Sequence, residues 1–210
     1  IVDAGVHRYL RHTGRTVAHR LVAFCPVSLR DDGDSAGGTR ASAMFVHLGE
    51  PEATAVERIE QVVAAMGAGK QELRSMSKDA AMVYAVALLG MAELTTATHV
   101  DRVTPPLANM VISNVPGPRE RMYLNGAALV GTFPVSAIAM SIGLNATLTS
   151  YHDRMDFGFV GNGVAMYDLT ELARQVRDAY EELKTASSRK RAARGHPTRA
   201  RRAKTARTKK

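Results

Sequence analysis

The stretch Pro106-Leu107-Ala108-Asn109-Met110-Val111-Ile112-Ser113-Asn114-Val115-Pro116-Gly117-Pro118 is the part of the chain on which its interpretation depends most. A short apolar segment leads directly into an Asn-Val-Pro-Gly-Pro turn. Each proline fixes its own φ at about −65° and favours extended geometry in the residue before it. Val115 and Gly117 are therefore both restricted, although Gly117 keeps access to positive φ. We predict a strand that ends at Asn114 in a nearly rigid turn, here called the elbow (Asn114 to Pro118).

The remaining apolar patterns predict four helices. Helical spacing indicates the first over residues 2–10, ended by Gly14, and a Thr54-to-Glu57 capping box begins a second that continues towards Arg74. The run of residues 80–92 is almost wholly apolar but shorter than the about 20 residues of a bilayer span, so we expect a buried helix. Asp168 to Glu171 caps a last helix. Its predicted inner face carries Leu169, Leu172, Val176, Tyr180 and Leu183.

Strand patterns alternate with these helices. The predicted strands are residues 16–27, 40–48, 110–112, 122–124, 128–135, 144–151 and 155–160. The pair 16–27 and 40–48 is expected near the edge of a sheet. Asn125-Gly126 and His152-Asp153-Arg154 are the expected hairpin turns. The result is a mixed α/β layer fold.

Three motifs resemble one known family. Ser113 to Pro118, with Pro26-Val27-Ser28-Leu29-Arg30 upstream and Met155-Asp156-Phe157-Gly158 downstream, resembles the C-terminal half of the bacterial wax ester synthase/acyl-CoA:diacylglycerol acyltransferase family. The resemblance extends from about Ile1 to Leu183. It implies one mixed-sheet lobe of a two-lobed, CoA-dependent acyltransferase with the active site between the lobes. At one point the chain departs from the family pattern, which has Gly-Asn where this sequence reads Gly38-Thr39.

The family's catalytic signature, His-His-x-x-x-Asp-Gly, belongs to the other lobe, and its second histidine acts as general base. No two of the seven histidines in this chain are adjacent. His152 and Asp156 satisfy His-x-x-x-Asp, but the resemblance places His152 at an exposed turn, so we interpret it as a solvated residue. We therefore expect no catalytic residue in this chain.

Substrate contacts are expected instead, on the basis of the resemblance. The candidate binding residues are Asn114, Val115, Pro116, Gly117, Pro118 and Arg30. The elbow either shapes one wall of the acyl tunnel or touches acyl-CoA or the acceptor directly. Arg30 can pair with a CoA phosphate or with a nearby aspartate. Ser28 lacks a Gly-x-Ser-x-Gly environment and is not expected to be a nucleophile.

Composition limits the other possibilities. Cys25 is the single cysteine, so an intrachain disulfide is impossible, and its apolar surroundings indicate a buried structural residue in a cytoplasmic protein. Scattered histidines without paired ligands predict no metal site, and no cofactor is expected beyond acyl-CoA as a substrate. Because the sequence opens without methionine or a signal segment, we expect Ile1 to be a truncation point.

Charge divides the chain into two parts. Residues 187–210 hold eleven of the twenty-eight Lys and Arg residues and no acid, whereas residues 1–186 carry a net charge of −3. We therefore predict a C-terminal lobe over residues 1–186 and a disordered basic tail over residues 187–210. The tail is either an unselective solvated extension or a contact for anionic membranes, lipid droplets or, less favoured, nucleic acid.

Two functional hypotheses follow. In the first, the chain is the C-terminal lobe of a diacylglycerol or long-chain-alcohol O-acyltransferase, is inactive alone, and works with an N-terminal catalytic lobe in cis or in trans. In the second, it is a non-catalytic binding or regulatory remnant tethered by its basic tail. Acyl chain length, acceptor identity and oligomeric state are not encoded in any pattern we find.

Overall fold

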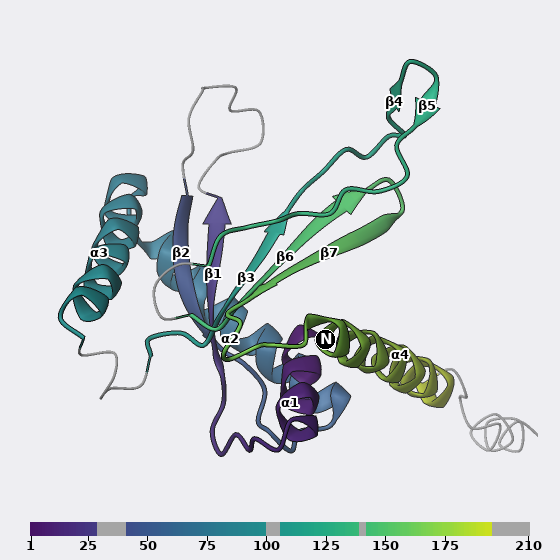
Figure 1. Cartoon of the computed structure of the whole chain (residues 1–210), viewed down its shortest axis with the longest axis horizontal. Coiled ribbons are helices and arrows are strands. Elements are labelled where there is room, and N and C mark those ends of the chain that lie inside the picture. The colour runs from purple at the N-terminus through teal and green to yellow at the C-terminus, as the bar shows by residue number, and fades with distance from the viewer. Residues whose placement is uncertain (29–40, 100–105, 139–141, 195–210) are drawn as a thin grey trace, which may run out of the picture.

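A mixed five-stranded sheet forms the centre of the molecule (Figure 1). The computed structural model describes residues 1–28, 41–99, 106–138 and 142–194. The sheet contains β1 (Val22–Ser28), β2 (Ala41–His47), β3 (Met110–Val115), β6 (Leu144–Tyr151) and β7 (Arg154–Gly161), in the order β2-β1-β3-β6-β7. The central pairs β1–β3 and β3–β6 are parallel, and the outer pairs β1–β2 and β6–β7 are antiparallel. The predicted α/β class is confirmed.

Four helices pack around this sheet: α1 (Val2–His12), α2 (Ala55–Ser75), α3 (Lys78–Ala97) and α4 (Leu169–Arg194). α1 packs against α4, α2 against β2 and α4, and α3 against β2. Buried side chains from the first helix, the sheet and the last helix form one core, in which Tyr9, Met110, Leu144 and Leu172 are fully enclosed.

The predicted capping residues mark the N-termini of α2 and α4 correctly. The Thr54 side chain accepts a hydrogen bond from the Glu57 N–H, and the Glu57 carboxylate accepts one from the Thr54 N–H, which completes the predicted capping box of α2. At α4, Asp168 Oδ1 accepts from the Glu171 N–H at 2.9 Å. Both predicted starts are confirmed because capping is decided within one helical turn.

A small hairpin projects beyond the ends of β6 and β7 (Figure 1). It pairs β4 (Tyr123–Leu124) with β5 (Ala127–Ala128), and Asn125 and Gly126 both have positive φ, at 48° and 80°. The predicted turn is therefore confirmed. A second hairpin joins β6 to β7, and His152 lies at its tip with a φ of 52°.

Three strand predictions are wrong in extent. β1 begins at Val22 and not at residue 16, and β3 ends at Val115, one residue after the predicted Asn114. Residues 129–135, predicted to be a strand, have no regular structure. The Leu129 N–H bonds to the Met122 carbonyl beside β4. The Leu129 and Val130 carbonyls and the Thr132 N–H bond to side chains of β6 and β7.

Two helices also differ from expectation. α3 forms where predicted but is not buried: in its described part only Ala81 is fully enclosed. In α4, Ala179 is buried while Tyr180, predicted to face inward, is 48% exposed. The helix continues to Arg194, so disorder from residue 187 is wrong for residues 187–194. The rest of the predicted tail lies outside the described residues.

Candidate functional site

The elbow continues the line of β3 alongside β6. β3 stays in parallel register with β6 as far as Val115, which pairs with Thr149. Asn114 and Val115 are exposed at the end of the strand. The Asn114 amide has no hydrogen-bond partner among the residues that the structure describes, so its donors and acceptor are open to solvent.

Gly117 is required for close approach and not for an unusual backbone angle. Its N–H donates to Ser150 Oγ at 3.1 Å, and a Cβ atom in its place would overlap the Ser150 carbonyl oxygen. Its φ is not positive, so the access of glycine to positive φ is not used here. One residue later, the Pro118 carbonyl accepts from the His152 N–H at 2.9 Å. These contacts join the elbow to the end of β6, which supports the rigidity predicted from its prolines.

Residues 129–138, which we call the strap, are held by side chains of β6 and β7. The Tyr151 hydroxyl donates to the Leu129 carbonyl at 2.9 Å and accepts from the Met122 N–H at 3.0 Å. Arg154 Nη1 donates to the Val130 carbonyl at 2.7 Å. Tyr151 thus connects the start of the strap to the base of the β4–β5 hairpin.

Asp156 and Gly158 continue this attachment along β7. Buried Asp156 accepts from the Thr132 N–H at 2.8 Å and from Arg154 Nε at 2.9 Å. A Cβ on Gly158 would overlap the Pro134 carbonyl oxygen, so only glycine lets the strap lie this close. The Met155-to-Gly158 motif therefore has a structural role, because it binds the strap. The motif is visible in the sequence, but no sequence pattern indicates that the strap is its partner.

His152 does not form a catalytic pair with Asp156. Its Nδ1 lies 2.9 Å from Asp153 Oδ1 at the exposed hairpin tip, and this contact helps to hold the pKa of Asp153 below its ordinary value. The Asp156 carboxylate instead accepts hydrogen bonds from Arg154 and from the strap. The prediction of a solvated turn histidine agrees with this geometry.

An open, largely apolar groove of about 820 Å³ lies between β7 and α4. The strap contributes Phe133 to its lining and α4 contributes Tyr180. The other lining side chains are Met155, Phe157, Phe159, Ala173 and Val176, together with Asp153, Arg154, Asp156 and Arg177 at polar positions and Ile1 at the chain end. The elbow residues do not line it. The alternation of apolar side chains along β7 could have indicated this apolar face of the strand. Only the tertiary fold places that face next to α4.

The remaining residues considered for a functional role are Cys25, Arg30 and possible metal ligands. Cys25 is buried, as predicted, and desolvation raises the pKa of its thiol to about 11, which disfavours the nucleophilic thiolate. Arg30 lies outside the described residues. Among the described residues, no group of three His, Cys, Asp or Glu side chains is arranged to hold a metal ion.

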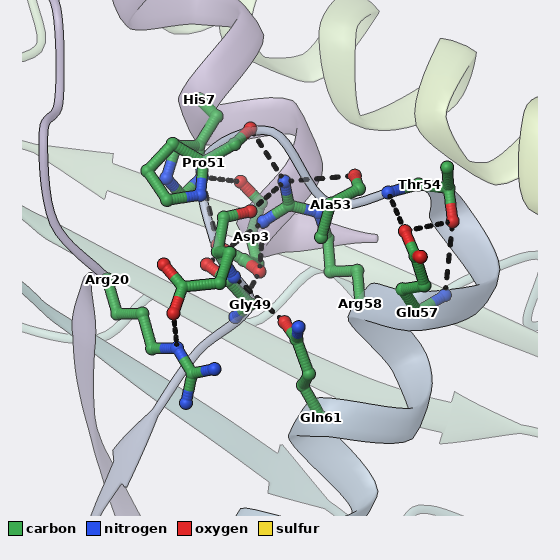
Figure 2. A network of polar contacts seen from close by, with 11 residues as sticks. Asp3, His7, Arg20, Gly49, Pro51, Ala53, Thr54, Glu57, Arg58 and Gln61 are labelled. Carbon is green, nitrogen blue, oxygen red and sulfur yellow. Dashed lines mark hydrogen bonds and ion pairs between the residues drawn. The ribbon is translucent and has the colours of Figure 1, made fainter.

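A buried charge cluster joins α1, α2 and the loop after β2 (Figure 2). Arg58 Nη1 donates to Asp3 Oδ2 at 2.7 Å, and the Gly49 N–H donates to the same oxygen at 2.8 Å. Arg58 also donates to the backbone carbonyls of Glu50 and Pro51. Asp3, His7 and Arg58 are all at least 94% buried. No local sequence pattern indicates this cluster, because Asp3 and Arg58 are 55 positions apart.

His7 adds a weaker contact to the cluster. Its Nδ1 lies 3.0 Å from both the backbone carbonyl oxygen and Oδ1 of Asp3. The carbonyl is the better-placed acceptor, since Oδ1 has no well-formed hydrogen bond. Burial raises the pKa of Asp3, but the contacts with His7 and Arg58 outweigh it, so the pKa lies below its ordinary value. The cluster is a structural ion pair between elements.

Comparison with known proteins agrees with this fold. Residues 37–184 match the family model described as the WS/DGAT C-terminal domain. The chain belongs to the WS/DGAT family. The predicted resemblance to this family is thereby confirmed, and the elbow and the strap lie within the matched WS/DGAT C-terminal domain.

Individual relatives support the assignment to the WS/DGAT family. The chain is 35% identical over 189 residues to a Mycobacterium tuberculosis protein provisionally named a diacylglycerol O-acyltransferase, covering 89% of this chain and 38% of that protein. It is similar in structure to the wax ester synthase/diacylglycerol acyltransferase from Marinobacter aquaeolei VT8, with a TM-score of 0.75, 30% identity, and coverage of 89% and 42%. The chain therefore spans about two fifths of the length of these relatives.

Proposed function

We propose that this chain is the C-terminal lobe of an acyl-CoA-dependent O-acyltransferase that forms triacylglycerol from diacylglycerol, or wax ester from a long-chain alcohol. The observation that carries the proposal is the match to the WS/DGAT C-terminal domain over residues 37–184, which is accompanied by the same fold as the Marinobacter enzyme. In this proposal acyl-CoA is a substrate and the reaction uses no further cofactor.

The proposed general base comes from outside this chain. Acyl transfer requires a base to take the proton from the acceptor hydroxyl as it attacks the thioester carbonyl. The chain contains no adjacent histidines. In its one His-x-x-x-Asp match, the histidine lies at the exposed hairpin tip beside Asp153, and the aspartate, Asp156, binds the strap. The catalytic lobe is therefore proposed to act in cis or in trans, and the isolated chain to be inactive.

The surface near the elbow supports the presence of a partner lobe. The β4–β5 hairpin exposes Tyr123 and Leu124, and Val130 beside it is exposed as well. A two-stranded hairpin is only marginally stable in water, so apolar side chains on it favour a partner that covers them. We propose that the N-terminal lobe packs here, with the elbow forming one wall of the substrate tunnel. Arg30 stays a proposed contact to a CoA phosphate or a neighbouring aspartate.

Acyl transfer tests the proposal directly. Radiolabelled acyl-CoA and diacylglycerol or hexadecanol are supplied to the isolated chain and to the longer protein that carries it. We expect product only from the longer protein, and a roughly tenfold lower turnover after Asn114→Ala, the effect of losing one substrate hydrogen bond. His152→Ala is the matched control and should leave turnover unchanged. Turnover by the isolated chain that His152→Ala abolishes would contradict the proposal.

The basic C-terminal segment favours a second candidate function. Eleven bases and no acid occupy residues 187–210, which suits a cytoplasmic binding or regulatory remnant tethered to an anionic surface, either membrane, lipid droplet or nucleic acid. The intact mass of the natural protein separates the two functions. A mass matching this chain alone would favour the remnant, whereas about twice that mass or more would favour the two-lobed enzyme.

A further inference from the structure

A hollow of about 340 Å³ lies at the carboxyl end of β1. Val27 and Ser28 of β1 line it, together with Lys70 and Arg74 from the last turns of α2. The rest of the lining is apolar and consists of Leu73, Met76 and Ala81. Val27 and Ser28 belong to the motif from Pro26 to Arg30, which takes no part in the elbow, the strap or the groove. The hollow therefore places two cations of α2 beside this motif.

Lys70 and Arg74 are two like charges without a described counter-charge. They are four residues apart, so they share one face of α2, where like charges repel. Both side chains are exposed, and neither forms an ion pair with a described residue. A basic residue in the last turn of a helix interacts favourably with the helix dipole, which accounts for Arg74, but this effect does not extend as far back as Lys70. An anion bound between the two side chains would remove their repulsion.

The hollow and the elbow lie at the same edge of the sheet. β1 and β3 are parallel, so their carboxyl ends at Ser28 and Val115 point the same way. The two strands pair over only two residues each, Ala23 and Phe24 in β1, and then diverge (Figure 1). In open α/β sheets, ligands bind outside the carboxyl ends of the parallel strands. A ligand with its anionic end in the hollow can therefore extend along this edge towards the elbow.

We propose that Lys70 and Arg74 bind phosphate groups of acyl-CoA, and that the pantetheine arm runs from the hollow towards the elbow. This inference rests on the acyltransferase function proposed above. The pantetheine arm separates the phosphates of CoA from the thioester, so a phosphate site apart from the elbow suits this substrate. Lys and Arg both bind phosphate groups in proteins through charge-assisted hydrogen bonds. Because a lipid headgroup offers the same phosphate chemistry, an assay without phospholipid separates the two sources.

Truncation of the substrate tests the phosphate contact. Turnover by the longer protein that carries this chain is measured with acyl-CoA and with acyl-pantetheine, which has no phosphate. The acceptor is hexadecanol in micelles of a neutral detergent. K70Q and R74Q should each raise the KM for acyl-CoA about fivefold, and together about twentyfold, because each removes one exposed ionic contact. The kcat should be nearly unchanged, since a contact to a distant phosphate is the same in the ground state and the transition state.

The same variants should use acyl-pantetheine as well as the wild-type protein does. This result also shows that they are folded, because a merely structural role of either residue would lower turnover of both substrates. R177Q/K184Q is the charge-matched control, since it removes two positive charges from exposed positions on α4. It should leave the KM for acyl-CoA unchanged.

Three results would overturn the inference alone. The first is an unchanged KM for acyl-CoA in K70Q/R74Q, as expected if the aspartates among residues 31–34, which lie outside the described residues, neutralise the pair. The second is an equal rise in KM in R177Q/K184Q. The third is an effect of K70Q/R74Q that appears only on phospholipid vesicles, which would assign the cations to a headgroup. A wild-type protein that forms no product from either thioester would overturn the proposed function, and this inference with it.

Discussion

At the scale of single residues, two tightly packed glycines allow the elbow and the strap to lie against the sheet. Gly117 lies against the Ser150 carbonyl and Gly158 against the Pro134 carbonyl, so a methyl group at either place has nowhere to go. Gly163, by contrast, has no atom within 4 Å of the position that a Cβ would occupy, and its φ is not positive. The chain therefore contains its own control for a glycine-to-alanine comparison.

We expect Gly117→Ala to destabilise the fold by about 1–3 kcal/mol, because the elbow must move away from β6 to accommodate the methyl group. Gly163→Ala should be neutral or stabilise by up to about 1 kcal/mol, since it only restricts the unfolded chain. Urea unfolding of both variants measures the difference. Equal stability of the two variants would mean that the elbow is not packed against β6 as described.

The buried Asp3–Arg58 pair makes a second residue-scale prediction. Arg58→Ala leaves the Asp3 carboxylate buried without its main partner and should cost about 3–5 kcal/mol in unfolding free energy. The pKa of Asp3 is lowered in the folded state from an ordinary value of 3.8. The stabilisation is therefore complete above pH 4 and is lost as the pH falls through the lower, folded-state pKa.

Unfolding free energies measured from pH 7 down to pH 2 test the direction of this pH dependence. The wild-type chain should lose stability on the acid side more steeply than Arg58→Ala. The surface pair of Arg20 and Glu50 supplies the control, because Arg20→Ala removes an exposed contact worth at most about 1 kcal/mol. A similar cost for Arg20→Ala and Arg58→Ala would contradict the importance assigned to burial.

At the scale of elements, Tyr151 of β6 connects two segments that lack extensive pairing of their own. Its hydroxyl bonds to backbone groups of Met122 and Leu129, at the base of the β4–β5 hairpin. Tyr151→Phe keeps the buried ring and removes only this bridge. We expect hydrogen exchange of the Met122 amide to accelerate roughly tenfold, with exchange in the core strands β3 and β6 unaffected.

Tyr180→Phe is the control for this experiment, because the Tyr180 ring is half exposed on α4 and its hydroxyl has no described hydrogen-bond partner. It should not change exchange at Met122. Protection of Met122 that survives Tyr151→Phe would show that the hairpin base is held by something other than this bridge.

At the scale of the whole molecule, the exposed apolar surface is the dominant feature. It is concentrated on the outer face of α3 and around the β4–β5 hairpin, at opposite edges of the sheet (Figure 1). Scattered apolar side chains are normal on protein surfaces, but grouped ones indicate contact with a partner or a lipid phase. The chain spans about two fifths of its relatives' length, so part of this surface is a candidate for contact with the rest of such a protein.

We expect the isolated chain to bind a hydrophobic dye such as anilinonaphthalene sulfonate, and to bind less after Leu124→Gln and Val130→Gln, which remove apolar surface beside the hairpin. In the longer protein, the same two substitutions should leave dye binding unchanged if the N-terminal lobe covers the hairpin. Val164→Gln, at an exposed loop position, is the control. Equal effects of the hairpin substitutions in both proteins would contradict a lobe contact at this place.

The sequence by itself determined the α/β class, the family, the helix starts at Thr54 and Asp168, and the Asn125-Gly126 turn. Helix caps and turns are determined by hydrogen bonds within three or four residues of sequence. The three family motifs can be recognised from the sequence alone, without knowing which residues lie near them in space. Only the tertiary structure decided that residues 129–138 form a strap and not a strand, that α3 is exposed, and that Asp3 meets Arg58. Those outcomes depend on which distant segment lies opposite each side chain, and no local pattern contains that information.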